Sequence, residues 1–258
     1  MNILEVKHLT KEFGGLTATS DINMTIKKNS ITAVIGPNGA GKTTFFNMIT
    51  AVYHPTSGDI LLNGKSLVGL KPHQVSQFGI TRTFQNIRLF ENMTVLENVL
   101  VGMHQNLKSH WIGTLLQLPH IRKIEENART TAYDILNYVG LENYVNENAG
   151  NLAYGAQRRL EIGRAIAAKP KVLLLDEPAA GMNPKETERL TNLIHDMRTK
   201  LDVTIILIEH DMNLVMKISD SIYVLDHGEL IASGKPNEIR NNKKVIEAYL
   251  GKGAVSNG

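Results

Sequence analysis

Hydrophobic and polar positions along the chain follow different spacings in different thirds of the sequence. In the first third they alternate, as in "ILEVKHLTKEF" and "TATSDINMTI", and glycines separate the runs. Alternation with a period of two is typical of strands that are buried on one face. This part therefore predicts an N-terminal antiparallel β subdomain, followed by a Gly-rich loop and a helix over residues 42–51.

The middle third has the spacing of amphipathic helices. Its segments "VLENVLVGMHQNL" and "EENARTTAYDILNYVGL" place apolar residues three or four positions apart, and Pro119 interrupts the pattern between them. The change of pattern begins at about residue 86. We predict an inserted helical subdomain over residues 86–157.

Continuous apolar runs mark the final third. They are "VLLL" before Asp176 and "VTIILI" before Glu209, and "ETERLTNLIHDMRTK" between them has helical spacing. Such runs are typical of parallel strands that are covered on both faces. A hairpin, "IYVLDHGELIASG", follows with an Asp-His-Gly turn. The chain is therefore expected to fold as one α/β domain over residues 1–258 around a mostly parallel sheet, with a flexible tail at residues 251–258.

Composition narrows the classes of function. The 28 Lys and Arg against 25 Asp and Glu leave a net charge of +3, which is too small and too scattered to indicate a nucleic-acid partner. The chain has no cysteine, which excludes disulfides and thiol catalysis. Its start lacks the apolar core of a secretion signal. No apolar run approaches the roughly 20 residues that cross a bilayer, so a partner is expected to supply any membrane span.

The segment "GPNGAGKTT" has the spacing of a phosphate-binding loop, with a strand before it and a helix after it. Its glycines let backbone N–H groups point at a phosphate, and the helix start adds a favourable dipole. Lys42 would reach the β- and γ-phosphates, and the Thr43 hydroxyl would coordinate Mg²⁺. A Gly-rich turn with a chance Lys-Thr is the alternative. The motif predicts a P-loop NTPase core whose nucleotide-binding residues are Gly36, Pro37, Asn38, Gly39, Ala40, Gly41, Lys42, Thr43 and Thr44.

Two acids follow the buried run "VLLL". Asp176, at the end of the strand, would hold Mg²⁺ through its water shell, and Glu177 would orient or deprotonate the water that attacks the γ-phosphate. The alternative is a solvated pair before a proline turn.

His210 and Gln85 complete the candidate chemistry. His210 follows the second apolar run, so it should emerge at the same sheet edge as Asp176 and could hydrogen-bond the γ-phosphate and the attacking water. The amide oxygen of Gln85, in "RTFQN", could reach Mg²⁺. Taken singly, a structural histidine and a polar surface glutamine are the alternatives.

These motifs together resemble the ATP-binding-cassette ATPases. "GPNGAGKTT", "TRTFQN", "LAYGAQRRLEIGRA", "VLLLDEP" and "IEH" stand in the order of that family, up to about Leu250. The wording "TRTFQNIRLFENMTVLENVLVGMH", the longer helical insert after it and "LAYG" in place of "LSGG" are similar to the LivG-type subunit of branched-chain amino acid importers. The resemblance implies ATP as the nucleotide, with Gln85 as the metal-touching switch residue and His210 as the γ-phosphate contact. It also implies that Phe13 stacks on adenine, although Phe13 alone could be a core strand residue.

The resemblance also implies a dimer. In this family the signature helix, here beginning near Gly155, faces the nucleotide of a second cassette subunit, so ATP binds between two chains and favours closure. The alternative is a buried helix that ends at Lys169 and carries Arg158 and Arg159 on a solvated face. Ala153 and Ala156 depart from the usual Ser and Gln of the signature, and Asn183 departs from a frequent Asp. With these departures, a lower rate of hydrolysis and two unequal sites in a dimer are alternatives to the usual behaviour.

The chain is predicted to be a peripheral ATPase at the cytoplasmic face of the inner or plasma membrane. It would drive amino acid import through a separate permease, and it would act indirectly with a substrate-binding protein. An apolar cluster of the insert could be a small core or a permease docking surface. The alternatives are a lipopolysaccharide-type exporter ATPase, a soluble clamp on DNA or ribosomes, and a small-molecule kinase. The apolar cluster of the helical insert consists of Trp111, Leu115, Leu116 and Leu118.

Overall fold

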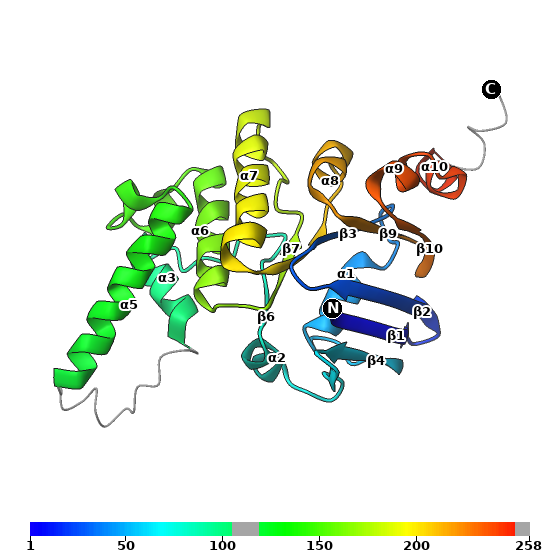
Figure 1. The fold of residues 1–258 in the computed structure, drawn as a ribbon, viewed down its shortest axis with the longest axis horizontal. Helices are drawn as coiled ribbons and strands as arrows, with labels where there is room; N and C mark the ends of the chain where they lie inside the picture. The colour runs from blue at the N-terminus through cyan, green and yellow to red at the C-terminus, as the bar shows by residue number, and fades with distance from the viewer. Residues whose placement is uncertain (105–118, 251–258) are drawn as a thin grey trace.

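Two sheets and the helices around them form the molecule (Figure 1). The computed structural model describes residues 1–104 and 119–250. The predicted cluster around Trp111 and the predicted tail at residues 251–258 lie outside the described residues. The first sheet has the strand order β2-β1-β4-β5, and its neighbouring strands are antiparallel. Its strands are β1 (Asn2–Phe13), β2 (Leu16–Lys27), β4 (Ser57–Leu62) and β5 (Lys65–Ser66).

The second sheet has the strand order β10-β9-β3-β8-β7-β6. Strands β9 to β6 in this order run parallel, and β10 is an antiparallel edge strand. Every residue of β3, β7 and β8 is buried, because helices and the first sheet cover both faces. The predicted α/β fold, with a mostly parallel sheet and an antiparallel N-terminal sheet, is confirmed. The strands are β3 (Ile31–Ile35), β6 (Ile80–Arg82), β7 (Val172–Asp176), β8 (Thr204–Ile208), β9 (Ser221–Asp226) and β10 (Glu229–Gly234).

The pairing register makes the ends of three central strands level. Val34 of β3 pairs with Ile208 of β8, and Asp176 of β7 pairs with the same residue. The carboxyl ends of these strands therefore lie side by side. The loops that leave them meet at one edge of the sheet, which is where ligands bind in parallel α/β sheets.

Helix α1 (Lys42–Ile49) lies between the two sheets. Its Phe45 and Phe46 are fully buried in a cluster that takes residues from β1, β2 and β4 on one side and from β3, β7 and β8 on the other. The Ser20 N–H also donates to Gly228 O at 2.8 Å, which joins β2 to the β9–β10 turn. The Gly228 N–H in turn donates to Ala40 O at 3.2 Å, which ties this turn to the loop before α1.

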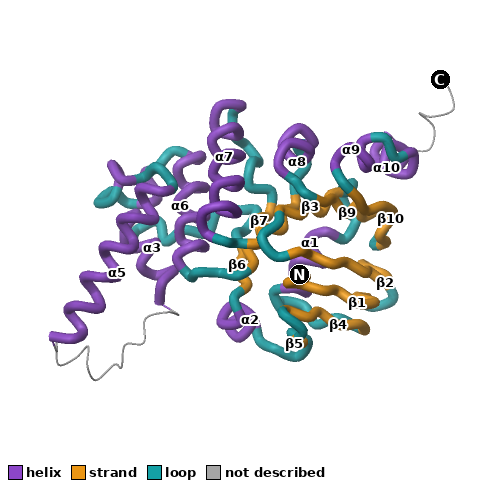
Figure 2. Tube along the Cα trace, viewed as in Figure 1, coloured by secondary structure: helices purple, strands orange, loops and turns teal. Residues whose placement is uncertain are grey.

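Helices α3 (Val95–Met103), α5 (Pro119–Tyr138) and α6 (Tyr154–Ala167) lie together, away from the first sheet (Figure 2). Helices α3 and α6 approach closely because a glycine stands at their crossing. A Cβ atom at Gly102 would lie 2.2 Å from Arg164 O, whereas one at Gly163 would be in ordinary contact, 3.5 Å from the Val139 side chain. Two 3₁₀ helices, Glu142–Tyr144 and Ala149–Asn151, join α5 to α6.

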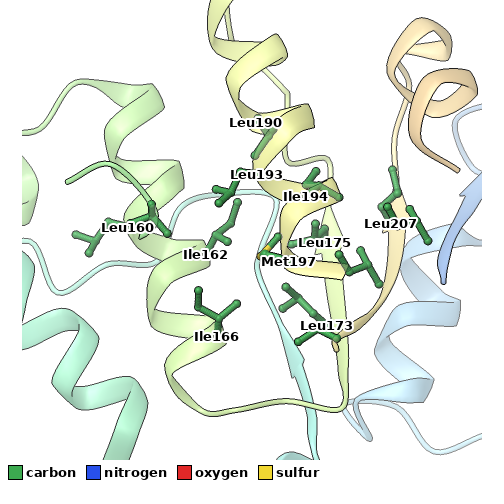
Figure 3. Packing of buried hydrophobic residues seen from close by; sticks show 14 of the residues in the cluster. Leu160, Ile162, Ile166, Leu173, Leu175, Leu190, Leu193, Ile194, Met197 and Leu207 are labelled. Atoms are coloured by element: carbon green, nitrogen blue, oxygen red, sulfur yellow. The ribbon is translucent and has the colours of Figure 1, made fainter. Parts of the chain in front are cut away.

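A continuous apolar cluster connects α6 to the second sheet (Figure 3). Ile162 and Ile166 of α6 meet Met197 of α7 and Leu173 of β7. Burial of such side chains contributes about 1.5–3 kcal/mol each. The helical segment is thus packed on the sheet rather than attached by loops alone. The remaining helices are α2 (Pro72–Phe78), α7 (Pro184–Leu201), α8 (Met212–Ile218), α9 (Pro236–Arg240) and α10 (Lys243–Leu250).

The structure corrects one expectation for α6. The alternative interpretation placed Arg158 and Arg159 on a solvated face, but Arg158 is fully buried (0% exposed). Its guanidinium can be buried because Glu161, one turn further along, lies 2.9 Å away. Arg159 is half-buried, and its Nε donates to Val139 O at 3.0 Å.

Candidate functional site

The loop between β3 and α1 runs against the backbone of neighbouring segments. A Cβ atom at Gly36 (φ +150°) would lie 2.0 Å from Leu225 O, and one at Gly41 (φ +96°) would lie 2.6 Å from Ala18 O. Only glycine fits such close approaches. Because Gly41 directly precedes α1, the free N–H groups of the first helical turn open onto this loop. The loop is therefore shaped to wrap an anionic group.

Lys42 is buried, and its ammonium holds the loop together. Its Nζ donates to Gly36 O at 2.8 Å and to Pro37 O at 2.9 Å. Burial lowers the pKa of Lys42, and the negative charges of Glu177 and Asp176 oppose this shift. The positive charge thus stands between the loop and the two acids.

A cavity of about 580 Å³ opens over this loop. The loops that follow β3, β7, β8 and β6 contribute to its wall, because the ends of these neighbouring strands lie at the same edge of the sheet. The cavity brings together most of the residues that the sequence analysis singled out. They are Asn38, Gly39, Ala40, Gly41, Lys42, Thr43, Thr44, Gln85, Glu177 and His210.

Asp176 is buried at the end of β7 and forms an ion pair with Arg82. Arg82 Nη2 lies 2.6 Å from Asp176 Oδ2, and both side chains are less than a tenth exposed. Arg82 Nη1 also donates to Asn47 Oδ1 of α1 at 2.6 Å. A charge-assisted bond of this kind fixes the carboxylate orientation. Arg82 thereby ties Asp176 to the helix that follows the Gly-rich loop.

Two side chains meet the carboxylate of Glu177. Gln85 Nε2 donates to Glu177 Oε2 at 3.1 Å, and His210 Nε2 lies 2.9 Å from Glu177 Oε1. Glu177 has a positive φ of 47°, an uncommon backbone conformation for a residue with a side chain and one that often marks a functional position. Its N–H donates to Ile208 O at 2.9 Å. The arrangement orients a carboxylate toward the cavity, where it can accept a proton from a bound water.

Comparison with known proteins identifies the family of the chain. The family model described as "ABC transporter" matches residues 19–180, and the model described as "Branched-chain amino acid ATP-binding cassette transporter" matches residues 229–255. The chain belongs to the ATP-binding cassette (ABC) transporter family. It is therefore an ABC ATPase, and ATP is its nucleotide.

Relatives of this ABC ATPase match it along nearly its whole length. The high-affinity branched-chain amino acid transport ATP-binding proteins LivG of Escherichia coli and BraF of Pseudomonas aeruginosa are 50% and 49% identical to it, over 96% of this chain and 98% of theirs. An ATP-binding cassette solved in its ADP conformation has a TM-score of 0.83 at 31% identity and covers 97% of this chain and 99% of its own. A dimeric cassette bound to ADP and Pi has a TM-score of 0.77 at 25% identity, over 91% and 99%.

Oxygen atoms in the wall of the cassette's cavity and on Asp176, next to the cavity residue Glu177, fit Mg²⁺. This ion prefers hard oxygen ligands and keeps several waters, and the predicted ligands offer a hydroxyl (Thr43), an amide (Gln85) and a carboxylate (Asp176). Within the described residues, no group of three His, Asp or Glu side chains could hold a metal ion by itself. Mg²⁺ here would therefore need phosphate oxygens and water as further ligands.

Five of the predicted site residues do not line the cavity: Gly36, Pro37, Asp176, Phe13 and Gly155. The Phe13 ring is 40% exposed at the end of β1 and meets the edge of Tyr53 at 5.2 Å between centroids. Gly155 is buried in the first turn of α6, and a Cβ atom there would lie 2.6 Å from Glu186 Oε1 of α7. The role predicted for each remains a prediction.

Several cavity residues were not predicted from the sequence. Leu16, Thr17 and Ala18 come from β2, and His227 comes from the β9–β10 turn. The Asp-His-Gly turn was recognised, but its position beside the Gly-rich loop depends on the contact between the two sheets. None of the cassette's described helices is both long and apolar enough to cross a bilayer.

Proposed function

We propose that this chain is the ATP-binding and ATP-hydrolysing subunit of an importer for branched-chain amino acids. The relatives that are 49–50% identical to it are ATP-binding proteins of such transport, and the match at its C-terminal part belongs to the same kind of transporter. Other subunits, a permease and a substrate-binding protein, recognise the amino acid. The chain works at the cytoplasmic face of the membrane as a peripheral subunit.

ATP binds with its phosphates against residues 36–44. The first N–H groups of α1 donate to the β-phosphate, and Lys42 exchanges its contacts with two loop carbonyls for phosphate oxygens. Mg²⁺ would be held by Thr43, Gln85 and, through water, Asp176, and would neutralise charge on the phosphates. The ion pair with Arg82 keeps Asp176 in place.

Glu177 is the general base of hydrolysis. The observation that carries this role is the convergence of Gln85 and His210 on its two carboxylate oxygens beside the Gly-rich loop. These partners fix the carboxylate so that it can orient a water and accept its proton. His210 then contacts the γ-phosphate.

A second cassette completes each site. Gly155 lies outside its own chain's cavity, and a solved cassette of this fold is dimeric with ADP and Pi bound. In a head-to-tail dimer the start of α6 would face the partner's ATP. ATP then stabilises the closed dimer by contacting both chains, and hydrolysis removes that preference.

A groove beside the Gln85 loop suits the permease. This cavity, of about 590 Å³, is lined by residues from α2, the loop after β6, α3 and α6. Exposed apolar side chains, Phe90 and Val101, lie beside the charged Arg88 and Arg164 in its wall. A short amphipathic helix fits such a surface. Closure of two cassettes would move two permease halves together.

Substitution of Glu177 tests the function. Glu177→Gln should bind ATP normally, because the loop and Lys42 are unchanged, while the turnover number falls by about 10²–10⁴-fold. The ATP-bound dimer should accumulate. Phosphate release and size-exclusion chromatography with purified protein measure both, and cells that carry only this variant should lose uptake of radiolabelled leucine.

Glu142→Gln is the matched control, because Glu142 is an exposed glutamate in a 3₁₀ helix away from the cavity. It should leave hydrolysis and uptake unchanged. ATPase activity near that of the parent protein in Glu177→Gln would refute the role of Glu177. Normal uptake in cells that lack the chain altogether would refute the transport function.

A further inference from the structure

An ion pair with almost no solvent exposure lies near the middle of α6. Arg158 and Glu161 are 0% and 1% exposed, and Arg158 Nη1 lies 2.9 Å from Glu161 Oε2. Removing two charges from water costs several kcal/mol per ion unless further hydrogen bonds satisfy them. The partners of this pair therefore indicate what it is for.

The further partners lie mainly on the backbone of the Gln85 loop, defined here as residues 84–88. Arg158 Nη1 donates to Phe84 O at 2.6 Å, and its Nη2 donates to Gln85 O at 2.7 Å. Glu161 Oε1 accepts from the N–H groups of Phe84 and Arg88, both at 3.3 Å. Both members of the pair thus bind the main chain of the same loop, and bonds to charged groups are the strong ones.

The hydrogen-bond partners of the backbone change from the sheet to α6 between residues 83 and 84. The Thr83 N–H still donates to Leu174 O of β7 at 2.9 Å, so residue 83 belongs to the sheet. Phe84 is already bound to α6 through both its N–H and its C=O. The backbone between residues 83 and 84 is therefore the boundary between the sheet and the body that contains α6.

Arg158 also reaches the start of its own helix. Its Nη2 donates to the Tyr154 hydroxyl at 3.2 Å. The Tyr154 ring in turn lies against Gly181, where a Cβ atom would be 3.4 Å from it. Gly181 belongs to the loop that follows Glu177. Through Tyr154, the ion pair is thus linked to the loop that follows Glu177 as well as to the Gln85 loop.

We propose that Arg158 and Glu161 are positioning residues that make the Gln85 loop move with α6. The distance between the Gln85 amide and the Glu177 carboxylate is then set by the place of α6 relative to the sheet. Through the proposed dimer, on which this part of the inference rests, the helix that contacts the partner's ATP would also place Gln85 over its own.

A pair that only stabilised the fold would behave differently. Apolar side chains of similar volume often replace a buried ion pair with little loss of stability. They cannot donate to the carbonyls of residues 84 and 85 or accept from the loop N–H groups. A positioning role is therefore lost in an apolar double variant even where packing is retained.

The experiment compares the full-length protein with the double variant Arg158→Met and Glu161→Leu. The thermal midpoint should stay close to that of the parent protein, because packing is retained. The affinity for ATP measured without Mg²⁺ should also be unchanged, because the Gly-rich loop is untouched. Hydrogen exchange of the Phe84 and Arg88 amides should become about tenfold faster or more, since they lose their acceptor, while Thr83 keeps its protection. The turnover number should fall by about tenfold to a hundredfold with little change in KM.

Arg159→Met is the matched control. It removes an arginine from the same helix, but the bond lost is to Val139 O of the α5 side and not to the Gln85 loop. Exchange at residues 84–88 and the turnover number should stay as in the parent protein. The conservative variant Arg158→Lys keeps the charge beside Glu161 but loses the forked donors, so both readouts should lie between those of the parent and of the double variant.

Parent-like exchange and turnover in the double variant would overturn the proposal, as would an equal effect of Arg159→Met. If the double variant does not fold, Arg158→Lys decides, and parent-like values for it would overturn the proposal as well. All these readouts need ATP and the purified chain but no amino acid. A failure of leucine uptake with intact exchange results would therefore remove the proposed transport function and leave this inference standing.

Discussion

Glu209 is a buried carboxylate that joins two loops of the nucleotide site. It is 3% exposed, and its oxygens accept from the Ala179 N–H at 2.8 Å and from the His210 N–H at 2.9 Å. The loop after Glu177 is thereby tied to the strand end that carries His210. These partners could not be predicted from the sequence, because the pairing of β7 with β8 brings them together. The ion pair of Arg82 with Asp176 escaped prediction for the same reason.

The titration of Glu209 should appear in the stability of the protein. Burial raises the pKa of Glu209, with a smaller contribution from the charge of Glu177, whereas the unfolded chain titrates near 4.5. The stabilising contribution is therefore fully present below about pH 4.5 and is lost as the pH rises through the raised pKa. Over this pH range the free energy of unfolding of the parent protein should fall relative to that of Glu209→Gln. The total fall should be about 1.4 kcal/mol for each unit by which the pKa of Glu209 in the folded protein exceeds its pKa in the unfolded chain.

Urea unfolding of both proteins between about pH 4 and pH 8 measures this difference. Glu209→Gln is the reference, because all other titrating groups are the same in both proteins. A difference that stays constant or grows with pH would contradict the expected direction.

Among the elements, those with local signals were predicted and those that depend on packing were not. Strands β3, β7 and β8 have uniform apolar runs, α1 follows the Gly-rich loop, and α6 ends shortly before Pro170. Helices α8, α9 and α10 were not predicted. They are five to eight residues long, too short to be stable alone, and they bury Ile218, Ile239 and Val245 in the larger apolar cluster.

Helix α3 offers a test of a local stabilising contact. The Thr94 hydroxyl accepts from the Glu97 N–H at 3.2 Å, and Glu97 Oε2 accepts from the Thr94 N–H at 2.8 Å, which is a capping box. Thr94→Ala should lower the free energy of unfolding by about 1 kcal/mol, as measured by urea denaturation. Thr130→Ala is the control, because Thr130 is exposed within α5 and its hydroxyl donates to Glu126 O, a carbonyl of its own helix. Equal losses of unfolding free energy in both variants would contradict a specific stabilising role of the capping box.

For the whole molecule, the nucleotide cavity and the start of α6 belong to different parts of one chain. The wall of the cavity includes no residue of the signature segment, and Gly155 packs against α7 instead. The site of one chain is thus expected to be incomplete until a second cassette adds its signature. The family resemblance predicted this arrangement, and the composition of a single chain could not have done so.

Cross-linking tests the arrangement directly. The chain has no cysteine, so Ala153→Cys and Asn38→Cys would introduce its only thiols at two exposed positions. In a Glu177→Gln background, a short bis-maleimide should join two chains when Mg·ATP is present and should do so little without it. The single Ala153→Cys variant is the control and should give no such product. Linkage within one chain, seen as a cross-linked monomer by mass spectrometry, would contradict the head-to-tail dimer.

The level ends of β3, β8 and β7 determine which insertions and deletions the protein tolerates. Each strand residue advances the chain by about 3.3 Å and alternates the face of its side chain. Deletion of one residue from β7 would therefore withdraw Glu177 from His210 and turn Asp176 away from Arg82. Extra residues in the connections at the opposite edge of the sheet would leave these distances unchanged. Variation in chain length should accordingly collect in those connections, while the three strands keep five residues each.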